Sequence, residues 1–186
     1  FQLVYYDCHQ SCWLSFPLLR DGTYNMTSSE ETLYLIGGSD EKTEAFGTTL
    51  VQYQTHSTDQ WQELPNPTYQ YAGMRSVCCV FERKFYVCDE TGQNVEVYNP
   101  VTKNWNLIES VNLDIGFRCS RMVSFVKRLW LFSTNKDEDF RIHLFDPESN
   151  AWNQYFKLNR ILNSQVFQER MKILDVVVLN DNNKRS

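Results

Sequence analysis

The chain has 186 residues, of which 42% are hydrophobic and 15% aromatic, so it carries enough apolar material for one domain with a packed core. This composition excludes an intrinsically disordered chain. The formal net charge of −5 argues against nucleic acid and anionic membrane surfaces as partners, because both are bound through basic patches.

The sequence carries no sign of a membrane or secretory destination. It contains no run of 18 apolar residues and no basic-then-apolar signal layout at its start, so we expect a cytoplasmic chain. It lacks an initiator Met, and we expect it to be cut from a longer protein. An even count of six cysteines would permit disulfides in a secreted protein. Cys78, Cys79 and Cys88 lie in apolar strand-like runs, where we expect reduced thiols in the core.

Four of the five tryptophans recur at spacings of 48, 44 and 47 residues: Trp13, Trp61, Trp105 and Trp152. An aromatic residue precedes each of them by seven or eight positions: Tyr6, Tyr53, Tyr98 and Phe145. A period in the forties indicates a chain built from one supersecondary unit repeated along the sequence. Architectures of this kind mostly bind and seldom catalyse.

Each unit has the same order of apolar runs, turns and loops, taken along the chain. The first complete unit predicts strands at 32–38 and 49–53. The second predicts strands at 76–81, 85–88, 95–98 and from 105, with turns at 82–84 and 99–104. The third predicts strands at 122–126, 129–132, 142–145 and from 152, with turns at 127–128 and 146–151. Residues 165–174 come closest to a helical period, but by position they are the first strands of another unit.

Runs of three to six residues rich in Val, Tyr, Phe and Trp predict antiparallel strands. Four strands per unit form one small twisted sheet, and such sheets arranged radially make a β-propeller. We therefore expect an all-β chain with a single propeller region over 1–179 and a polar tail over 180–186. Its units are a partial one at about 1–13, complete ones at about 14–61, 62–105 and 106–152, and a partial one at 153–179.

Three short motifs are similar to those of the kelch repeat. Residues 33–38, Leu-Tyr-Leu-Ile-Gly-Gly, resemble the kelch strand that ends in a glycine pair. Residues 98–105 and 145–152 look like the kelch turn that runs from Tyr-Asp-Pro to Trp, and 6–13 is a looser copy. The resemblance covers about 4–155 and implies a kelch-type β-propeller. A WD40 propeller is the rival interpretation, disfavoured because no Trp is followed by Asp and no Gly-His pair occurs.

The kelch resemblance also implies a function. The turns and the charge are most similar to the kelch half of BTB-kelch proteins, in which the BTB part binds a cullin-3 ubiquitin ligase and the propeller holds a protein or peptide substrate. These 186 residues contain no BTB or BACK segment, so cullin-3 would be reached only through a domain outside them. Family propellers have five to seven blades, so three or four leave an open ring that a longer chain or another chain would complete. A cytoskeletal, actin-type kelch protein is the alternative, and a propeller enzyme is a more remote one.

The loops between strands two and three and between strands four and one emerge on one face because strand direction alternates. We expect the first kind at 39–48, 89–94 and 133–141, and the second kind at about 14–22, 65–75, 109–121 and 155–163. Ordered scaffolds place binding on such loops. We expect an acidic rim around inner arginines, which would favour partners with a basic stretch. The candidate partner-binding residues are Arg20, Asp40, Glu41, Tyr71, Arg75, Arg118, Arg121, Asp137, Glu138, Asp139 and Arg141. The residues expected to pack the blades are Trp13, Tyr34, Gly37, Gly38, Tyr53, Trp61, Tyr86, Tyr98, Trp105, Trp130, Phe145 and Trp152.

Catalytic chemistry has little support in the sequence. The three histidines, His9, His56 and His143, show no metal-ligand spacing with one another or with the cysteines. The sequence contains no nucleophile elbow, phosphate-binding loop or dinucleotide fingerprint. We therefore expect no catalytic residue, no metal and no cofactor.

Overall fold

The structure is a computed structural model that describes residues 4–7, 11–15, 24–29, 32–37, 49–54, 61–71 and 75–158. These residues form antiparallel β-sheets joined by turns and loops, and no α-helix occurs among them. Several predicted features lie outside the described residues: Arg20, Gly38, Asp40, Glu41, and the segments 165–174 and 180–186.

Three sheets of four strands follow one another along the chain. The first contains β3 (Tyr24–Ser29), β4 (Thr32–Gly37), β5 (Thr49–Gln54) and β6 (Gln62–Glu63). The second contains β7 (Ser76–Phe81), β8 (Lys84–Asp89), β9 (Val95–Asn99) and β10 (Asn104–Ile108). The third contains β11 (Arg118–Phe125), β12 (Arg128–Thr134), β13 (Phe140–Asp146) and β14 (Ala151–Leu158). A further pair, β1 (Val4–Asp7) and β2 (Cys12–Ser15), precedes them.

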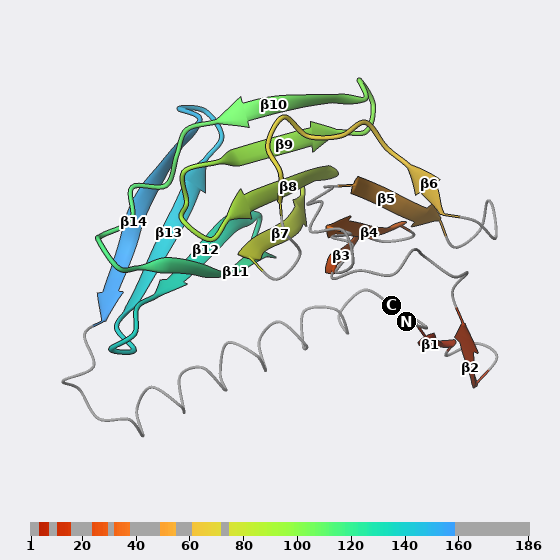
Figure 1. Cartoon of the computed structure of the whole chain (residues 1–186), viewed down its shortest axis with the longest axis horizontal. Helices are drawn as coiled ribbons and strands as arrows, with labels where there is room; N and C mark the ends of the chain where they lie inside the picture. Colours follow the sequence, from red (N-terminus) through yellow and green to blue (C-terminus); the bar gives the residue numbers. More distant parts are fainter. Residues whose placement is uncertain are drawn as a thin grey trace, which may run out of the picture.

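The three sheets are arranged as blades. Within each sheet, strands that are consecutive in the sequence are neighbours, and all of them pair antiparallel. The first strand of the middle sheet, β7, contacts both β3 and β11. Figure 1 shows the resulting fan, with the first strands gathered on its inner side and β10 and β14 on its outer side. The expected fold class is confirmed: the described part of the chain is all-β, built of four-stranded antiparallel propeller blades.

The spacing between each aromatic and the following Trp has a simple geometric cause. Tyr6 and Trp13, Tyr98 and Trp105, and Phe145 and Trp152 are directly opposite each other on the last two strands of their sheets. In the second and third blades, the tight turn between these strands uses the Asn or Asp that follows the aromatic. The Asn99 side chain accepts a hydrogen bond from the amide of Val101 at 2.9 Å, and Asp146 accepts one from the amide of Glu148 at 3.0 Å.

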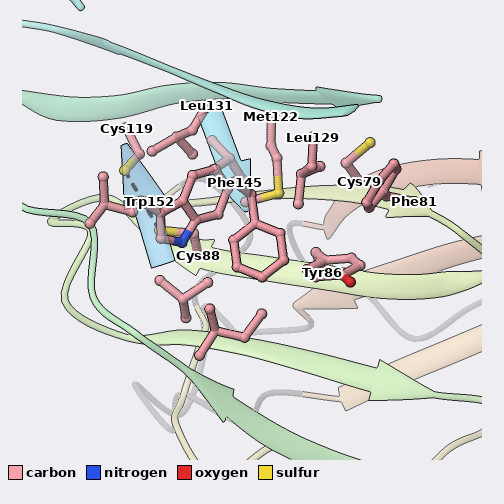
Figure 2. Close-up of a cluster of buried hydrophobic side chains, with 14 residues drawn as sticks. Cys79, Phe81, Tyr86, Cys88, Cys119, Met122, Leu129, Leu131, Phe145 and Trp152 are labelled. Atoms are coloured by element: carbon pink, nitrogen blue, oxygen red, sulfur yellow. Dashed lines mark hydrogen bonds between the residues drawn. The ribbon is translucent and has the colours of Figure 1, made fainter. Parts of the chain in front are cut away.

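Two apolar cores lie between adjacent blades. The side chains on the two faces of β8 belong to different cores, because successive side chains of a strand point to opposite faces. Phe85 and Val87 pack toward the first blade, and Tyr86 and Cys88 pack toward the third. Figure 2 shows the core between the second and third blades. Its other main members are Val77, Cys79, Phe81, Val95, Ile108, Val111, Cys119, Met122, Leu129, Leu131, Phe145 and Trp152.

Most repeat positions that the structure describes are buried or half-buried. Tyr34, Tyr86, Tyr98, Phe145 and Trp152 are buried, and Trp61 and Trp105 are half-buried. Gly37 is buried with φ 137°, a left-handed conformation that favours glycine, at the end of β4. Tyr53 belongs to β5, although its side chain is outside the description.

Two tryptophans depart from the expected packing role. The side chain of Trp13 is 70% exposed, so the prediction that it packs a blade core is wrong for this chain. Trp130 belongs to neither buried cluster and is half-buried. It lies edge-on against Tyr155, with ring centroids 5.2 Å apart, and donates a hydrogen bond from Nε1 to the Phe125 carbonyl at 3.0 Å. The neighbouring residues Leu129 and Leu131 point into the core between the second and third blades instead.

Several predicted turn and loop boundaries are also wrong. The first turn of the third blade consists of Val126 and Lys127, both with positive φ, so Arg128 already belongs to β12. The loop expected over 133–141 shrinks to 135–139, because Ser133 and Arg141 pair across β12 and β13. The connection expected over 109–121 shrinks to 109–117, because β11 begins at Arg118.

Candidate functional site

The loop face is the side of the molecule on which the loop after β8, residues 90–94, meets the connections between blades. The Glu90 amide donates a hydrogen bond to the Arg75 carbonyl at 2.8 Å, and the Glu90 carbonyl accepts one from the Cys119 amide at 2.8 Å. Residue 90 therefore bridges the starts of β7 and β11, the inner strands of two blades. Arg75, whose carbonyl binds residue 90, and Arg118, which directly precedes Cys119, are both exposed.

An ion pair reinforces the bridge. The Arg118 guanidinium lies 2.7 Å from the Glu90 carboxylate, and the Arg118 side chain is still 69% exposed. An exposed pair of this kind contributes little to stability, about 0–1 kcal/mol. It orients the Arg118 side chain while leaving most of it open to a partner.

The side chain of Asp89 holds the 90–94 loop in place through hydrogen bonds. Its Oδ1 accepts hydrogen bonds from the amides of Thr91 and Gln93, both at 3.1 Å, and its Oδ2 accepts one from the Asn94 side chain at 2.7 Å. The buried Gly92 has φ 75°, and a Cβ there would lie 3.1 Å from atoms of Val111 and Leu113. Glycine is therefore required at this position, both for its conformation and for the close approach of the next connection.

The connection between the second and third blades, residues 109–117, is bound to the same loop. The Val111 amide donates to the Gly92 carbonyl at 2.7 Å, and the Ser110 hydroxyl donates to the Gln93 carbonyl at 2.7 Å. The loop after β8 and this connection consequently form one hydrogen-bonded surface rather than two independent loops.

A β-bulge in β11 determines where Arg121 points. The register between β11 and β12 shifts between Cys119 and Arg121. Cys119 and Met122 therefore both face the core, although they are three residues apart, and Arg121 is exposed. The structure thus keeps three of the predicted partner-binding residues accessible: Arg118 and Arg121 on β11, and Arg75 directly before β7.

Arg141 is not available to a partner, contrary to the prediction. It is only 4% exposed, and its Nε lies 3.3 Å from the Asp114 carboxylate. Its guanidinium stacks over the Phe117 ring at 4.4 Å from the centroid, a cation–π contact. The residue belongs to β13, and its side chain fixes the 109–117 connection to the third blade.

Tyr71 is also buried, at 1% exposure, so its predicted binding role is wrong. Its hydroxyl donates to the carboxylate of Glu96 at 3.0 Å, and the amides of Thr68 and Tyr69 donate to the same carboxylate at 3.1 Å or less. Burial and the neighbouring Glu96 charge raise the pKa of Tyr71 above its usual range. Glu96, a fully buried acid on β9, therefore holds the connection between the first two blades.

The 135–139 loop carries the acidic residues of the third blade. Asp137 and Glu138 are exposed, and Glu138 has a positive φ of 63°. Asp139 is half-buried and accepts a hydrogen bond from the Asn135 side chain at 3.2 Å. The Asn135 side chain in turn accepts from the amides of Asp137 and Asp139 at 3.0 and 2.9 Å. This loop thus presents two accessible carboxylates and uses the third internally.

The described residues contain no group of three or more His, Cys, Asp and Glu side chains that could hold a metal ion. In the same part of the chain, no helix is long and apolar enough to cross a membrane. His143 is buried on β13, where loss of solvation lowers its pKa below the usual value. Cys78, Cys79 and Cys88 are buried free thiols, as predicted.

The sequence and the fold of this chain are similar to those of proteins with kelch repeats or a propeller fold. No protein-family model matches the chain. An F-box/kelch-repeat protein of Arabidopsis thaliana is 22% identical over 153 residues, which cover 81% of this chain and 42% of that protein. The solved structure of YjhT superposes with a TM-score of 0.59 at 8% identity and covers 83% of this chain and 52% of YjhT, a likeness of fold alone. The protein has the fold of a kelch-type β-propeller, and it spans 42% of the length of the Arabidopsis thaliana protein and 52% of the length of YjhT.

Proposed function

We propose that the chain is the partner-binding part of a kelch propeller that recruits another protein through its loop face. The observation that carries this proposal is the Glu90 bridge, which bonds to the backbone of Arg75 and to the side chain of Arg118, two exposed arginines at the starts of the inner strands. Arginine on a rigid, hydrogen-bonded frame is a frequent hot-spot residue in protein interfaces. The kelch-repeat relative supports an interaction role in general terms.

The finer proposal is that this propeller is the substrate-recognition part of a ubiquitin-ligase adaptor in the cytoplasm. The motif resemblance favours a BTB-kelch adaptor that binds cullin-3 through a domain outside this chain. The relative in Arabidopsis thaliana pairs its kelch repeats with an F-box instead. Capture of cullin-3 by the full-length protein would support the BTB form. If the full-length protein carries an F-box and does not bind cullin-3, that result would support an F-box adaptor.

The acidic side of the loop face gives a direct test of the binding role. The double variant Asp137→Lys, Glu138→Lys reverses two exposed charges and keeps the backbone amide of Asp137 that bonds to the Asn135 side chain. We expect weaker binding of a partner with a basic stretch and a smaller dependence on salt. Unchanged binding and unchanged salt dependence would overturn the acidic-rim part of the proposal.

A cytoskeletal kelch protein of the actin-binding type is the second candidate. Co-sedimentation with actin filaments separates it from the adaptor, because only the cytoskeletal form would sediment. We do not propose an enzymatic reaction, a cofactor or a metal for this chain.

A further inference from the structure

Two buried thiols from different blades meet directly beneath the Glu90 bridge. The sulfur of Cys88 on β8 lies 3.6 Å from the sulfur of Cys119 on β11. Figure 2 marks this contact with a dashed line, next to Trp152 in the core between the second and third blades. Cys88 is fully buried, whereas Cys119 is 8% exposed.

The backbone around the two cysteines is already held together. The Cys119 amide is bonded to the carbonyl of Glu90, two residues after Cys88. Disulfide formation requires the sulfurs to approach from 3.6 Å to about 2.05 Å. Side-chain rotation about Cα–Cβ can supply a movement of this size without separating the strands.

The remaining buried thiols lack this arrangement. Cys78 and Cys79 are adjacent on β7, so their side chains point to opposite faces of the sheet and belong to different cores. They serve as matched internal controls, because they are buried thiols of the second blade whose sulfurs do not meet a sulfur of another blade.

We propose that Cys88 and Cys119 form a reversible disulfide between the second and third blades when the protein meets a peroxide. The Cys119 thiolate attacks hydrogen peroxide, which breaks the O–O bond, forms a sulfenic acid on Cys119 and releases hydroxide. The Cys88 sulfur then attacks the Cys119 sulfur. The S–O bond breaks, the S–S bond forms and water leaves. In total, two thiols and one peroxide give one disulfide and two waters.

The rate of this step and its effect follow from the surroundings of the pair. The hydrogen bond with Cys119 and burial raise the pKa of Cys88 well above its usual value, so the second step is slow at neutral pH and faster at higher pH. The disulfide closes a loop across two blades and therefore raises the thermal midpoint. It lies below Glu90 and Arg118, so it also stiffens the frame of the loop face.

The test is peroxide treatment of the folded protein, followed by alkylation of free thiols and tryptic mapping. We expect the peptides 85–103 and 119–121 to appear joined, with a midpoint rise of at least ~5 °C that dithiothreitol reverses. Cys119→Ser should abolish both changes. Cys78→Ala should retain both, because that thiol has no role in the pair.

Two outcomes would overturn the proposal. The first is full alkylation of Cys88 and Cys119 after peroxide treatment that oxidises the half-exposed Cys12. The second is a joined peptide that forms only in denaturant. Should Cys119→Ser fail to fold, the wild-type peptide map in native buffer decides the question by itself. The outcome does not depend on the proposed binding function.

Discussion

Phe145 and Trp152 face each other across β13 and β14, with ring centroids 5.1 Å apart and both side chains buried. The Trp152 ring also lies in the core between the second and third blades (Figure 2). Trp152→Ala should therefore remove both the ring pair and the contacts with the second blade. We expect a loss of about 3–5 kcal/mol in unfolding free energy, measured by urea denaturation.

Trp13 provides the matched control for that substitution. It occupies the same repeat position but is 70% exposed on β2. Trp13→Ala should cost less than about 1 kcal/mol in the same denaturation experiment. Equal losses for Trp13→Ala and Trp152→Ala would contradict the packing described for the third blade.

Glu96 should be essential for the connection between the first two blades. Its buried carboxylate accepts hydrogen bonds from two backbone amides and from the Tyr71 hydroxyl. Glu96→Gln replaces one acceptor oxygen by an NH₂ group, and we expect a loss of about 1.5–3 kcal/mol, compared with about 1 kcal/mol for Tyr71→Phe. Hydrogen exchange of the Thr68 and Tyr69 amides should accelerate in Glu96→Gln. Protection equal to wild type would show that Glu96 does not hold the connection.

His143 should make stability depend on pH. Burial lowers its pKa in the folded protein, so the unfolded chain, with a His pKa of about 6.5, binds the proton first as the pH falls. The stability due to neutral His143 is therefore complete above about pH 6.5 and declines as the pH falls toward the folded pKa. Within the described residues, neither ring nitrogen has a hydrogen-bond partner, so His143→Leu should fold. Denaturation between pH 5 and 7.5 should show a flatter profile for His143→Leu, and an identical profile would refute this assignment.

Val126 occupies an unfavourable backbone conformation. Its φ of 49° and the φ of 54° at Lys127 form a two-residue hairpin turn that suits Asn and Gly, not a β-branched residue. Val126→Asn should raise the unfolding free energy by about 0.5–1 kcal/mol. Val101→Asn, at an exposed turn residue outside the left-handed region, should leave it unchanged. A thermal midpoint for Val126→Asn at or below the wild-type value would contradict the turn geometry.

The blade order could be predicted from the sequence because its signals are local. In the second and third blades, the Asn or Asp that follows the aromatic makes the same side-chain turn, and this turn places the aromatic opposite the Trp. The positions of Tyr71 and Arg141 could not be predicted in this way. Their partners, Glu96 and Asp114, lie 25 and 27 residues away in the chain and come close only when the blades pack.

The burial of Glu96 could not be predicted from the sequence either. In the run 95–98, alternation suggests that one side of the strand faces water. A propeller blade is covered on both faces by its neighbours, so the acid is buried together with Val95 and Tyr98. The bulge between Cys119 and Arg121 likewise leaves no mark in the hydrophobic pattern, yet it decides which side chain reaches the surface.

The most direct test of the proposed binding face is a paired affinity capture with Arg118→Glu and Arg128→Glu. Both arginines are exposed, at opposite ends of the adjacent strands β11 and β12. Proteins captured by wild type from a cell extract are quantified by mass spectrometry, with equal thermal midpoints as the folding control. We expect Arg118→Glu to lose the partner and Arg128→Glu to retain it. Equal capture by both variants, or loss only in Arg128→Glu, would contradict the loop face as the binding surface.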